Sequence, residues 1–404
     1  MIFSPLPYSA LAEHILASPH LQLRQWNLKM MPKSQKIALK PNNKQATQFM
    51  KHCGYARIAF NAAHSEYIAD NSLSLFDIKR RFNSKKREVF EWCDELSQNV
   101  PKNAMHDFGD ALARYRSGQN AFPKKKRKAG KLSFRISNGR NSIKVESKRI
   151  LLPKIGWVRM REALRWDGDI INCTISKRGD RWFTSMLIET NDRGAPDLRG
   201  LPPVGVDVGI NSLAVTDDGT KYENPKALRS RLRKLRRLSK KLSRCQYLSN
   251  NWLKIKRRLA RLHYRIWCLR QDAQHKASTD IVNRASVIGI ESLNVKGLMQ
   301  NRKLSRALAD ASLHSFLSMI RYKALRRGVE IIEADRFFPS TKTCSRCNQK
   351  NDSMTLADRT FICPSCLYVQ DRDVNAAINL KQLAASLSES VNACGEIVNP
   401  ALVG

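Results

Sequence analysis

The stretch Val204-Gly-Val-Asp-Val-Gly-Ile210 predicts the centre of the fold. Its apolar residues indicate a buried strand that Asp207 closes, and Gly209 allows the chain to turn. A second stretch, Val287-Ile-Gly-Ile-Glu-Ser-Leu293, has the same form and places Glu291 after another buried strand. We therefore expect both carboxylates at the carboxyl edge of one α/β sheet.

A third acidic stretch, Asp371-Arg-Asp-Val-Asn-Ala-Ala377, enters the last predicted helix. With Asp207 and Glu291, Asp373 could hold two Mg²⁺ ions about 4 Å apart. Such a pair activates water and stabilises the leaving oxygen in phosphodiester hydrolysis. Each carboxylate taken alone could equally be a solvated strand end, so the prediction depends on the three together.

Four cysteines have the spacing of a metal site. Cys344-x₂-Cys347-x₁₅-Cys363-x₂-Cys366 is typical of a tetrahedral Cys₄ zinc ribbon, whose closed coordination makes it structural rather than catalytic. The alternative is a set of reduced structural thiols. The six other cysteines are scattered, which indicates reduced, buried thiols and a cytosolic setting rather than a disulfide framework.

The charge of the chain indicates its partner. Its 404 residues carry 72 Lys and Arg against 35 acids, a net charge of +37, and so large an excess is usually offset by a polyanion such as nucleic acid. The 42% apolar content suffices for packed cores. No apolar run approaches the ~20 residues that span a bilayer, so we expect no membrane partner.

Basic residues concentrate in two places. Between Lys226 and Lys276 there are 18 Lys or Arg and one acid, on two predicted amphipathic helices whose leucines recur every three or four residues, with a break near 249–251. We interpret the leucines as core, the basic faces as phosphate contacts, and Trp252, Tyr264 and Trp267 as packed rather than base-stacking. A basic loop begins at Pro123. The residues predicted to contact nucleic acid are Lys124, Lys125, Lys126, Arg127, Arg233, Lys234, Arg236, Arg237, Lys240, Lys241, Arg257 and Arg258.

The same patterns predict an α+β multidomain chain. A strand at 33–41 is followed by helical spacing over 43–117, with a helix beginning after Pro101, and then by strand alternation over 131–190. The expected parts are an extension (1–30), an N-terminal β-barrel (31–42 and 118–192) with an inserted helical unit (43–117), an α/β nuclease domain (200–340 and 371–387) with an inserted zinc ribbon (341–370), and a flexible tail (388–404).

Five stretches resemble the TnpB family, the compact RNA-guided nucleases of insertion sequences, and the related CRISPR type V effectors. Three resemble its RuvC motifs: Gly205-Val-Asp-Val-Gly-Ile-Asn211, Ile290-Glu-Ser-Leu-Asn-Val-Lys-Gly-Leu298 and Asp371-Arg-Asp-Val-Asn-Ala-Ala-Ile-Asn379. The others are Phe338-Pro-Ser-Thr-Lys-Thr-Cys-Ser-Arg-Cys347 and Cys53-Gly-Tyr-Ala-Arg-Ile-Ala-Phe-Asn61. The resemblance covers about residues 33–385.

The resemblance implies an RNase H-like (RuvC) site with Asp207, Glu291 and Asp373 as catalytic carboxylates. Asp371 is a rival for the third place, but the family pattern puts the ligand two residues before the Asn of Asn-Ala-Ala. Family ribbons often carry Gly after the second Cys of each pair, where Asn348 and Leu367 stand here. That turn favours a positive φ, which Asn tolerates and Leu adopts poorly.

The activity implied is RNA-guided cleavage of double-stranded DNA next to a short motif. The barrel would be the wedge-like domain and the helical unit the recognition domain, and one protein would bind one guide RNA transcribed from the element's end. Three alternatives remain open: a guide-directed repressor that does not cut, a transposase or accessory transposition protein, and a CRISPR type V-like effector.

Overall fold

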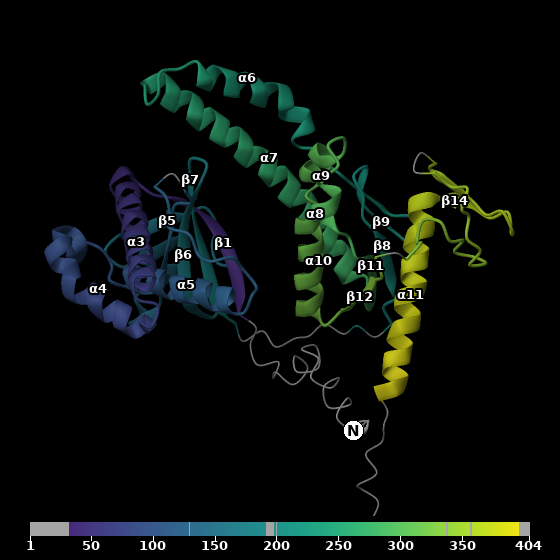
Figure 1. Ribbon diagram of the computed structural model, residues 1–404, viewed down its shortest axis with the longest axis horizontal. Helices are drawn as coiled ribbons and strands as arrows, with labels where there is room; N and C mark the ends of the chain where they lie inside the picture. The colour runs from purple at the N-terminus through teal and green to yellow at the C-terminus, as the bar shows by residue number, and fades with distance from the viewer. Residues whose placement is uncertain are drawn as a thin grey trace, which may run out of the picture. The chain divides into compact units, whose positions relative to one another are not determined.

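The computed structural model describes residues 32–128, 130–190, 198, 200–336, 338–355 and 358–395. The chain divides into two compact units, residues 1–193 and 194–404, and each is described by itself (Figure 1). The predicted extension at 1–30 and the end of the predicted tail, 396–404, lie outside the described residues.

The first unit packs three helices against one antiparallel sheet. The helices are α3 (Asn43–Ala69), α4 (Leu75–Val89) and α5 (Asn99–Arg116), with a 3-10 turn, η1 (Glu91–Glu95). The strands are β1 (Lys33–Lys40), β2 (Ser133–Ser137), β3 (Lys144–Glu146), β4 (Arg149–Leu152), β5 (Gly156–Met160), β6 (Asp169–Arg178) and β7 (Arg181–Glu189), and a second 3-10 turn, η2 (Gly139–Asn141), lies between β2 and β3.

The sheet is antiparallel and open. Its order is β2-β6-β7-β1-β5-β4-β3, and the described residues show no ladder between β2 and β3. The strands and the helices inserted after β1 match the sequence prediction, but closure of these strands into a barrel is not observed. β1 lies between β7 and β5, since it pairs with β7 from Lys33 to Leu39 and with β5 at Leu39 and Lys40.

One aromatic contact joins the helices of this unit to its sheet. Phe49 of α3 is fully buried and packs edge-on against Trp182 of β7, with ring centroids 5.0 Å apart, and against Phe134 of β2. Asn42 caps the start of α3 with a capping box. The Asn42 side chain accepts a hydrogen bond from the Gln45 backbone amide, and the Gln45 side chain accepts one from the Asn42 backbone amide. The helix starts at Asn43, as the apolar spacing predicts.

The second unit is built on a mixed five-stranded sheet. Its order is β10-β9-β8-β11-β12, with β8, β11 and β12 parallel and β8, β9 and β10 antiparallel. The strands are β8 (Val204–Asp207), β9 (Ser212–Thr216), β10 (Lys221–Glu223), β11 (Val287–Glu291) and β12 (Glu330–Ala334), and a separate hairpin pairs β13 (Thr360–Ile362) with β14 (Val369–Asp371). The two predicted buried strands, β8 and β11, are thus hydrogen-bonded neighbours.

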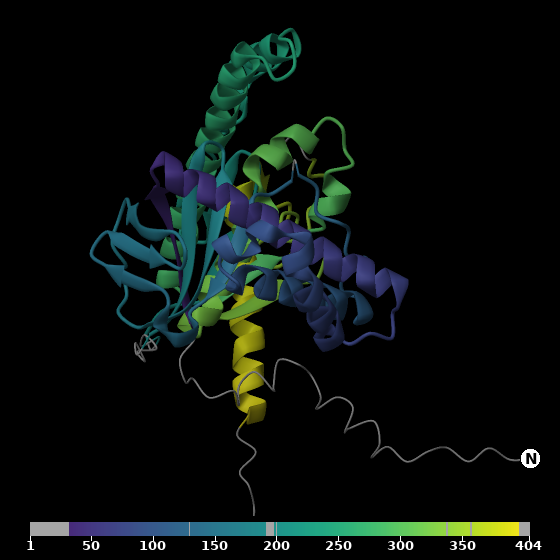
Figure 2. The same ribbon diagram turned by 90° about the vertical axis from the view of Figure 1, so that its left-hand side faces the viewer.

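The helices of this unit include a long hairpin and a final helix (Figures 1 and 2). They are α6 (Leu232–Ser243), preceded by η3 (Arg229–Arg231), α7 (Asn250–Asn283), α8 (Val295–Leu298), α9 (Ser305–Ala311), α10 (Leu313–Arg327) and α11 (Arg372–Gly395). The break expected near 249–251 separates α6 from α7. Among the described residues no helix is long and apolar enough to cross a bilayer.

Two helix boundaries differ from the prediction. α5 begins at Asn99, so Pro101 is its third residue rather than the residue before it. Proline fits there because the first turn of a helix has no intrahelical partner for its N–H groups. α11 continues to Gly395, beyond Leu387 where the pattern suggested a flexible tail. Ser and Asn residues between 386 and 392 obscured the helical spacing without preventing the helix.

Candidate functional site

Two predicted site carboxylates end adjacent strands. β8 and β11 pair in parallel with Ile290 beside Val206, so Asp207 and Glu291 follow at the same edge of the sheet. Parallel strands bring their carboxyl ends together, which is where open α/β sheets bind ligands. Both side chains are partly exposed at this edge.

The third carboxylate arrives on α11, whose backbone lies directly on these strands. A Cβ built on Gly205 of β8 would lie 1.8 Å from the Ala377 carbonyl oxygen, and one on Gly289 of β11 would lie 2.2 Å from that of Leu380. Only glycine permits so close an approach. Asp373 lies in the first turn of this helix, so the seating of α11 delivers it to the edge that carries Asp207.

The three carboxylates are close enough to interact electrostatically. Burial, followed by the negative charges of Glu291 and Asp373, raises the pKa of Asp207 to about 8, while Arg372 acts in the opposite direction. A carboxyl group whose pKa is raised by two like charges indicates a site suited to a cation. The carboxylates do not converge fully in this structure. Within the described ranges, the one set of ligand atoms that all lie within 4.8 Å of one another belongs to four cysteines.

Protein groups contact two of these carboxylates. The Ser340 hydroxyl donates to Glu291, and the Arg372 guanidinium lies 3.3 Å from an oxygen of Asp373. Arg372 also donates to the Asp358 carbonyl, which fixes its position beside the acidic edge.

Asp371 has a different environment from Asp373. Its carboxylate accepts from the backbone amides of Asp373 and Val374 at 2.9 and 3.3 Å, and Lys221 donates to it at 2.6 Å. Burial acts to raise its pKa, but the Lys221 hydrogen bond and the two amides outweigh burial and hold the pKa below the usual value. The Asp371 carboxylate therefore accepts hydrogen bonds from the first amides of α11 and is balanced by Lys221, whereas Asp373 is paired, among the described residues, with Arg372 alone.

The four predicted cysteines meet. The sulfurs of Cys344 and Cys366 are 3.7 Å apart and those of Cys347 and Cys363 are 3.5 Å apart. Tetrahedral zinc with Zn–S bonds of about 2.3 Å places its sulfurs roughly 3.8 Å from one another, so the observed cluster fits that ion.

Both knuckle turns have the left-handed backbone that the family resemblance implies, including the one at Leu367, which was expected to adopt it poorly. Asn348 has φ +60° and Leu367 has φ +59°. Leu367 is 75% exposed, so no packing of its side chain offsets the strain in its backbone.

Side-chain amides bind the first knuckle to α11. The Asn375 carboxamide accepts from the Ser345 amide and donates to the Thr343 carbonyl, and Asn379 donates to the carbonyls of Ser340 and Thr343. Asn375 and Asn379 are both buried. The ribbon, the helix that carries Asp373 and the serine that contacts Glu291 therefore form one hydrogen-bonded assembly.

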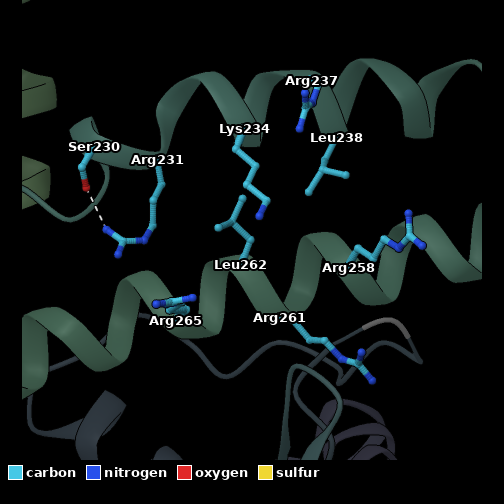
Figure 3. A pocket seen from close by; sticks show the side chains of 9 residues that line it. All are labelled: Ser230, Arg231, Lys234, Arg237, Leu238, Arg258, Arg261, Leu262 and Arg265. Atoms are coloured by element: carbon cyan, nitrogen blue, oxygen red, sulfur yellow. Dashed lines mark hydrogen bonds between the residues drawn. The ribbon is translucent and has the colours of Figure 1, made fainter.

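The predicted phosphate contacts divide into groups. Lys234, Arg237 and Arg258 line a groove between α6 and α7, together with Arg231, Arg261 and Arg265, which were not predicted (Figure 3). The other predicted residues of the hairpin lie outside this groove: Arg233, Arg236, Lys240, Lys241 and Arg257. Lys124, Lys125, Lys126 and Arg127 lie in an exposed loop after α5, which Asn61 anchors through two hydrogen bonds to the Lys126 backbone.

Two known proteins are similar to this chain over most of its length. A protein of Streptomyces pristinaespiralis named "Putative RNA-guided DNA endonuclease" is 32% identical over 89% of this chain and 90% of its own. The chain belongs to the TnpB family of RNA-guided DNA endonucleases. A protein of Escherichia coli (strain K12) named "Putative RNA-guided DNA endonuclease InsQ" is 28% identical over 90% of this chain and 94% of its own.

Two family models match parts of this TnpB-family chain. One described as "Probable transposase" (OrfB_IS605) matches residues 186–302, and the Cas12f1-like TNB domain matches 314–380, which includes all four cysteines. Among solved structures, the mini-RNA-guided endonuclease CRISPR-Cas_phi3 has a TM-score of 0.42 and 11% identity over 94% of this chain and 97% of its own. The Cas12f1–sgRNA–target DNA complex has a TM-score of 0.33 and 14% identity over 87% and 99%.

Sequence reasoning missed residues that position the site. Gly205 and Gly289 carried a signal, because glycine inside an apolar strand indicates a close backbone approach. Gly209, the glycine predicted to be important, turns the chain without a positive φ. Ser340, Asn375 and Asn379 stood within quoted motifs, but no pattern showed which groups they would bond.

Proposed function

We propose that this protein is an RNA-guided DNA endonuclease that cuts double-stranded DNA by Mg²⁺-dependent hydrolysis at an RNase H-like (RuvC) site. Membership of the TnpB family supports the activity, and the order of the five-stranded sheet supports the RuvC assignment. The observation that carries the proposal is geometric: Asp207 and Glu291 lie at the carboxyl ends of adjacent parallel strands, and Asp373 lies in the first turn of the helix whose backbone packs directly on those strands. Three carboxylates at one sheet edge are a donor set of the kind hard divalent cations prefer.

Asp207, Glu291 and Asp373 would hold the Mg²⁺ ions. When bound, these ions would activate water and neutralise the leaving oxygen of the phosphodiester. The chain's own residues orient the carboxylates. The Ser340 hydroxyl donates a hydrogen bond to the Glu291 side chain. The close packing of α11 on Gly205 and Gly289 sets the distance of Asp373 from the strands. Arg372, at the same edge, offers a cation to the phosphate or to a carboxylate.

The four cysteines would hold a structural zinc ion. Their sulfur–sulfur distances support this assignment, and the match of the TNB domain agrees with it. All four positions of the ion would be filled by protein, so the zinc would brace the ribbon and take no part in hydrolysis.

Guide RNA and target DNA would be the partners. The names of the relatives support both, and the net charge of +37 suits two polyanions. The first unit (31–42 and 118–192 with the 43–117 insertion) would provide wedge-like and recognition domains that read the heteroduplex and a short adjacent DNA motif. We propose one protein bound to one RNA from the element's end, in the cytoplasm of a bacterium or archaeon.

The test is to express the protein with its native flanking DNA, sequence any RNA that copurifies, and use that RNA in a plasmid cleavage assay. Guide-directed cutting is expected with Mg²⁺ and not with EDTA. Asp207→Ala should abolish cutting while RNA and target binding stay within about threefold of wild type. The absence of a discrete RNA, or undiminished cutting by the variant, would refute the proposal.

A further inference from the structure

Lys221 joins the edge of the five-stranded sheet to the start of α11. It lies on β10, a strand of three residues at one end of the sheet. Its ammonium group donates to the Asp371 carboxylate at 2.6 Å, across 150 residues of sequence. This contact is a direct link between an edge strand and the helix that carries Asp373.

Asp371 caps the first turn of that helix. One of its carboxylate oxygens accepts from the backbone amides of Asp373 and Val374, the second and third residues of α11, which is the usual arrangement of an N-cap residue. The other oxygen accepts from Lys221. Lys221 therefore holds the carboxylate that orients the backbone of Asp373.

A second ion pair joins α11 to the turn between β9 and β10. Lys381 lies 2.7 Å from Asp217, whose side chain is 10% exposed and whose other oxygen accepts from the Gly205 amide at 3.1 Å. Asp371 and Lys381 are ten residues apart, or roughly 15 Å along a helix axis at 1.5 Å per residue. Two attachments at this separation set the axial position and the tilt of α11, whereas the glycine contacts set its distance from the sheet.

The residue after Lys221 anchors β10 to α7. The Tyr222 hydroxyl donates to Asp280 at 2.5 Å, and Arg284 donates to the same hydroxyl. Arg284 also pairs with Asp218 at 2.8 Å, in the turn that leads into β10. These contacts hold a short edge strand in place, so Lys221 contacts Asp371 from a fixed position.

Asp373 needs this support because its neighbours repel it. Burial raises the pKa of Asp207, and the charges of Glu291 and Asp373 add to that shift. Such repulsion favours movement of the first turn of α11 away from the strands until a cation is bound. The hydrogen bond to Asp371 raises the pKa of Lys221, and the charge of Asp373 adds to that shift. Lys221 thus also offsets part of the negative charge at this edge of the sheet.

We propose that Lys221 is a positioning residue of the nuclease site, which acts through Asp371 to hold the first turn of α11 where Asp373 can bind a metal ion together with Asp207 and Glu291. The inference rests on the proposed function and deepens it, because Lys221 lies outside the set of three carboxylates. The side chains of Lys221 and Asp371 are 50% and 36% exposed. An exposed ion pair contributes little to stability, so loss of Lys221 should leave the fold intact.

The first test is a double-mutant cycle in the full-length protein with its copurified RNA. Lys221→Met removes the charge and keeps the length of the side chain, and Asp371→Asn removes the charge and keeps an oxygen for the helix amides. Each change should lower the single-turnover rate constant of guide-directed cleavage about tenfold, less than the loss of about 100-fold expected for a full 1 Å displacement. The double variant should lie within about twofold of either single one, because both changes break the same contact.

The cycle has a rescue variant and a matched control. Lys221→Arg keeps the cation and should cleave within about threefold of wild type. Arg321→Met breaks an ion pair with Glu333 at 2.8 Å that joins α10 to β12 at the opposite end of the same sheet, where both side chains are 40% exposed. It should lower Tm as much as Lys221→Met does and leave the cleavage rate constant unchanged.

Two outcomes of the cycle would overturn the proposal. If the effects of Lys221→Met and Asp371→Asn multiply, Lys221 does not act through Asp371. If Lys221→Met weakens target affinity and leaves the rate constant at saturation unchanged, the lysine contacts the DNA and does not position Asp373.

The second test measures hydrogen exchange and needs no cleavage. The amides of Asp373 and Val374 donate to Asp371, so Lys221→Met should speed exchange in the peptide that contains them at least about fivefold, and Arg321→Met should not. Unchanged exchange in the Lys221 variant would overturn the proposal. Failure of the wild-type protein to cut DNA would refute the proposed function, and the exchange rates would still decide whether Lys221 holds the first turn of α11.

Discussion

Replacing Gly205 with alanine should separate the third carboxylate from the other two. The added Cβ would lie 1.8 Å from the Ala377 carbonyl oxygen and 2.5 Å from the Lys381 amide nitrogen. Ordinary contact begins near 3.4 Å, so α11 must move away from β8 by about 1.5 Å. Both atoms belong to the helix backbone, so no side-chain rotation can relieve the clash.

This displacement sets the size of the effect. Overpacking of a core costs about 1–3 kcal/mol, and a backbone clash should reach the upper end. For a unit of this size, about 3 kcal/mol lowers Tm by roughly 6–12 °C. Asp373 moves with the helix, and a misplacement of about 1 Å at a reacting centre can reduce the rate about 100-fold.

The assay is guide-directed plasmid cleavage at a temperature below the Tm of the variant, with RNA affinity measured in parallel. We expect cleavage to fall at least 100-fold and RNA affinity to change less than threefold. Gly54→Ala is the control, since a Cβ on Gly54 meets nothing within 4 Å and alanine favours the helix it lies in. A Gly205→Ala protein with wild-type Tm and wild-type cleavage would refute the seating of α11 on β8.

Three further substitutions probe the second unit. Asp310→Ala should lower stability by about 3 kcal/mol, because it leaves a partly buried arginine without its partner; thermal unfolding checks this, and a change under 1 kcal/mol would contradict it. Leu367→Gly should stabilise the ribbon by roughly 0.5–1 kcal/mol, since relief of the strain in its left-handed backbone exceeds the entropy cost of glycine. Asn348→Gly should stabilise it less, because asparagine tolerates this backbone conformation. The resistance of bound zinc to a chelator compares the two variants, and the opposite order would exclude strain as the cause. Asn379→Ala removes two hydrogen bonds to backbone carbonyls, so it should lower the free energy of unfolding by about 2 kcal/mol and speed the release of zinc. An unchanged release rate would show that these hydrogen bonds do not brace the ribbon.

The sequence predicted elements whose signal is local. The strands that end in Asp207 and Glu291, the helix that begins at Asn43 and the cysteine pairs depend on apolar period, capping and spacing over short distances. The positive φ of Leu367, directly after the second cysteine of its pair, was implied by the family resemblance and not by the cysteine spacing, and the structure shows that this leucine does adopt it.

Other features depend on contacts between distant segments. The rotation of α6 against α7 determines which cations of this helical hairpin line the groove between them. The sequence therefore could not predict that Arg231, Arg261 and Arg265 line it while neighbouring cations do not. The environment of Asp371 depends on Lys221, 150 residues away. Closure of the first sheet depends on the register of its edge strands, which alternation alone does not set.

The glycine contacts also determine how the site moves. Most helices rest on a sheet through a layer of side chains, and rotamer changes in that layer let the two slide past each other. At Gly205 and Gly289 this layer is missing, and backbone meets backbone. The ends of β8 and β11 and the first turns of α11 should therefore fluctuate together as one rigid body. Their amide hydrogens should be among the slowest in the second unit to exchange with solvent, while those of the α6–α7 hairpin exchange early.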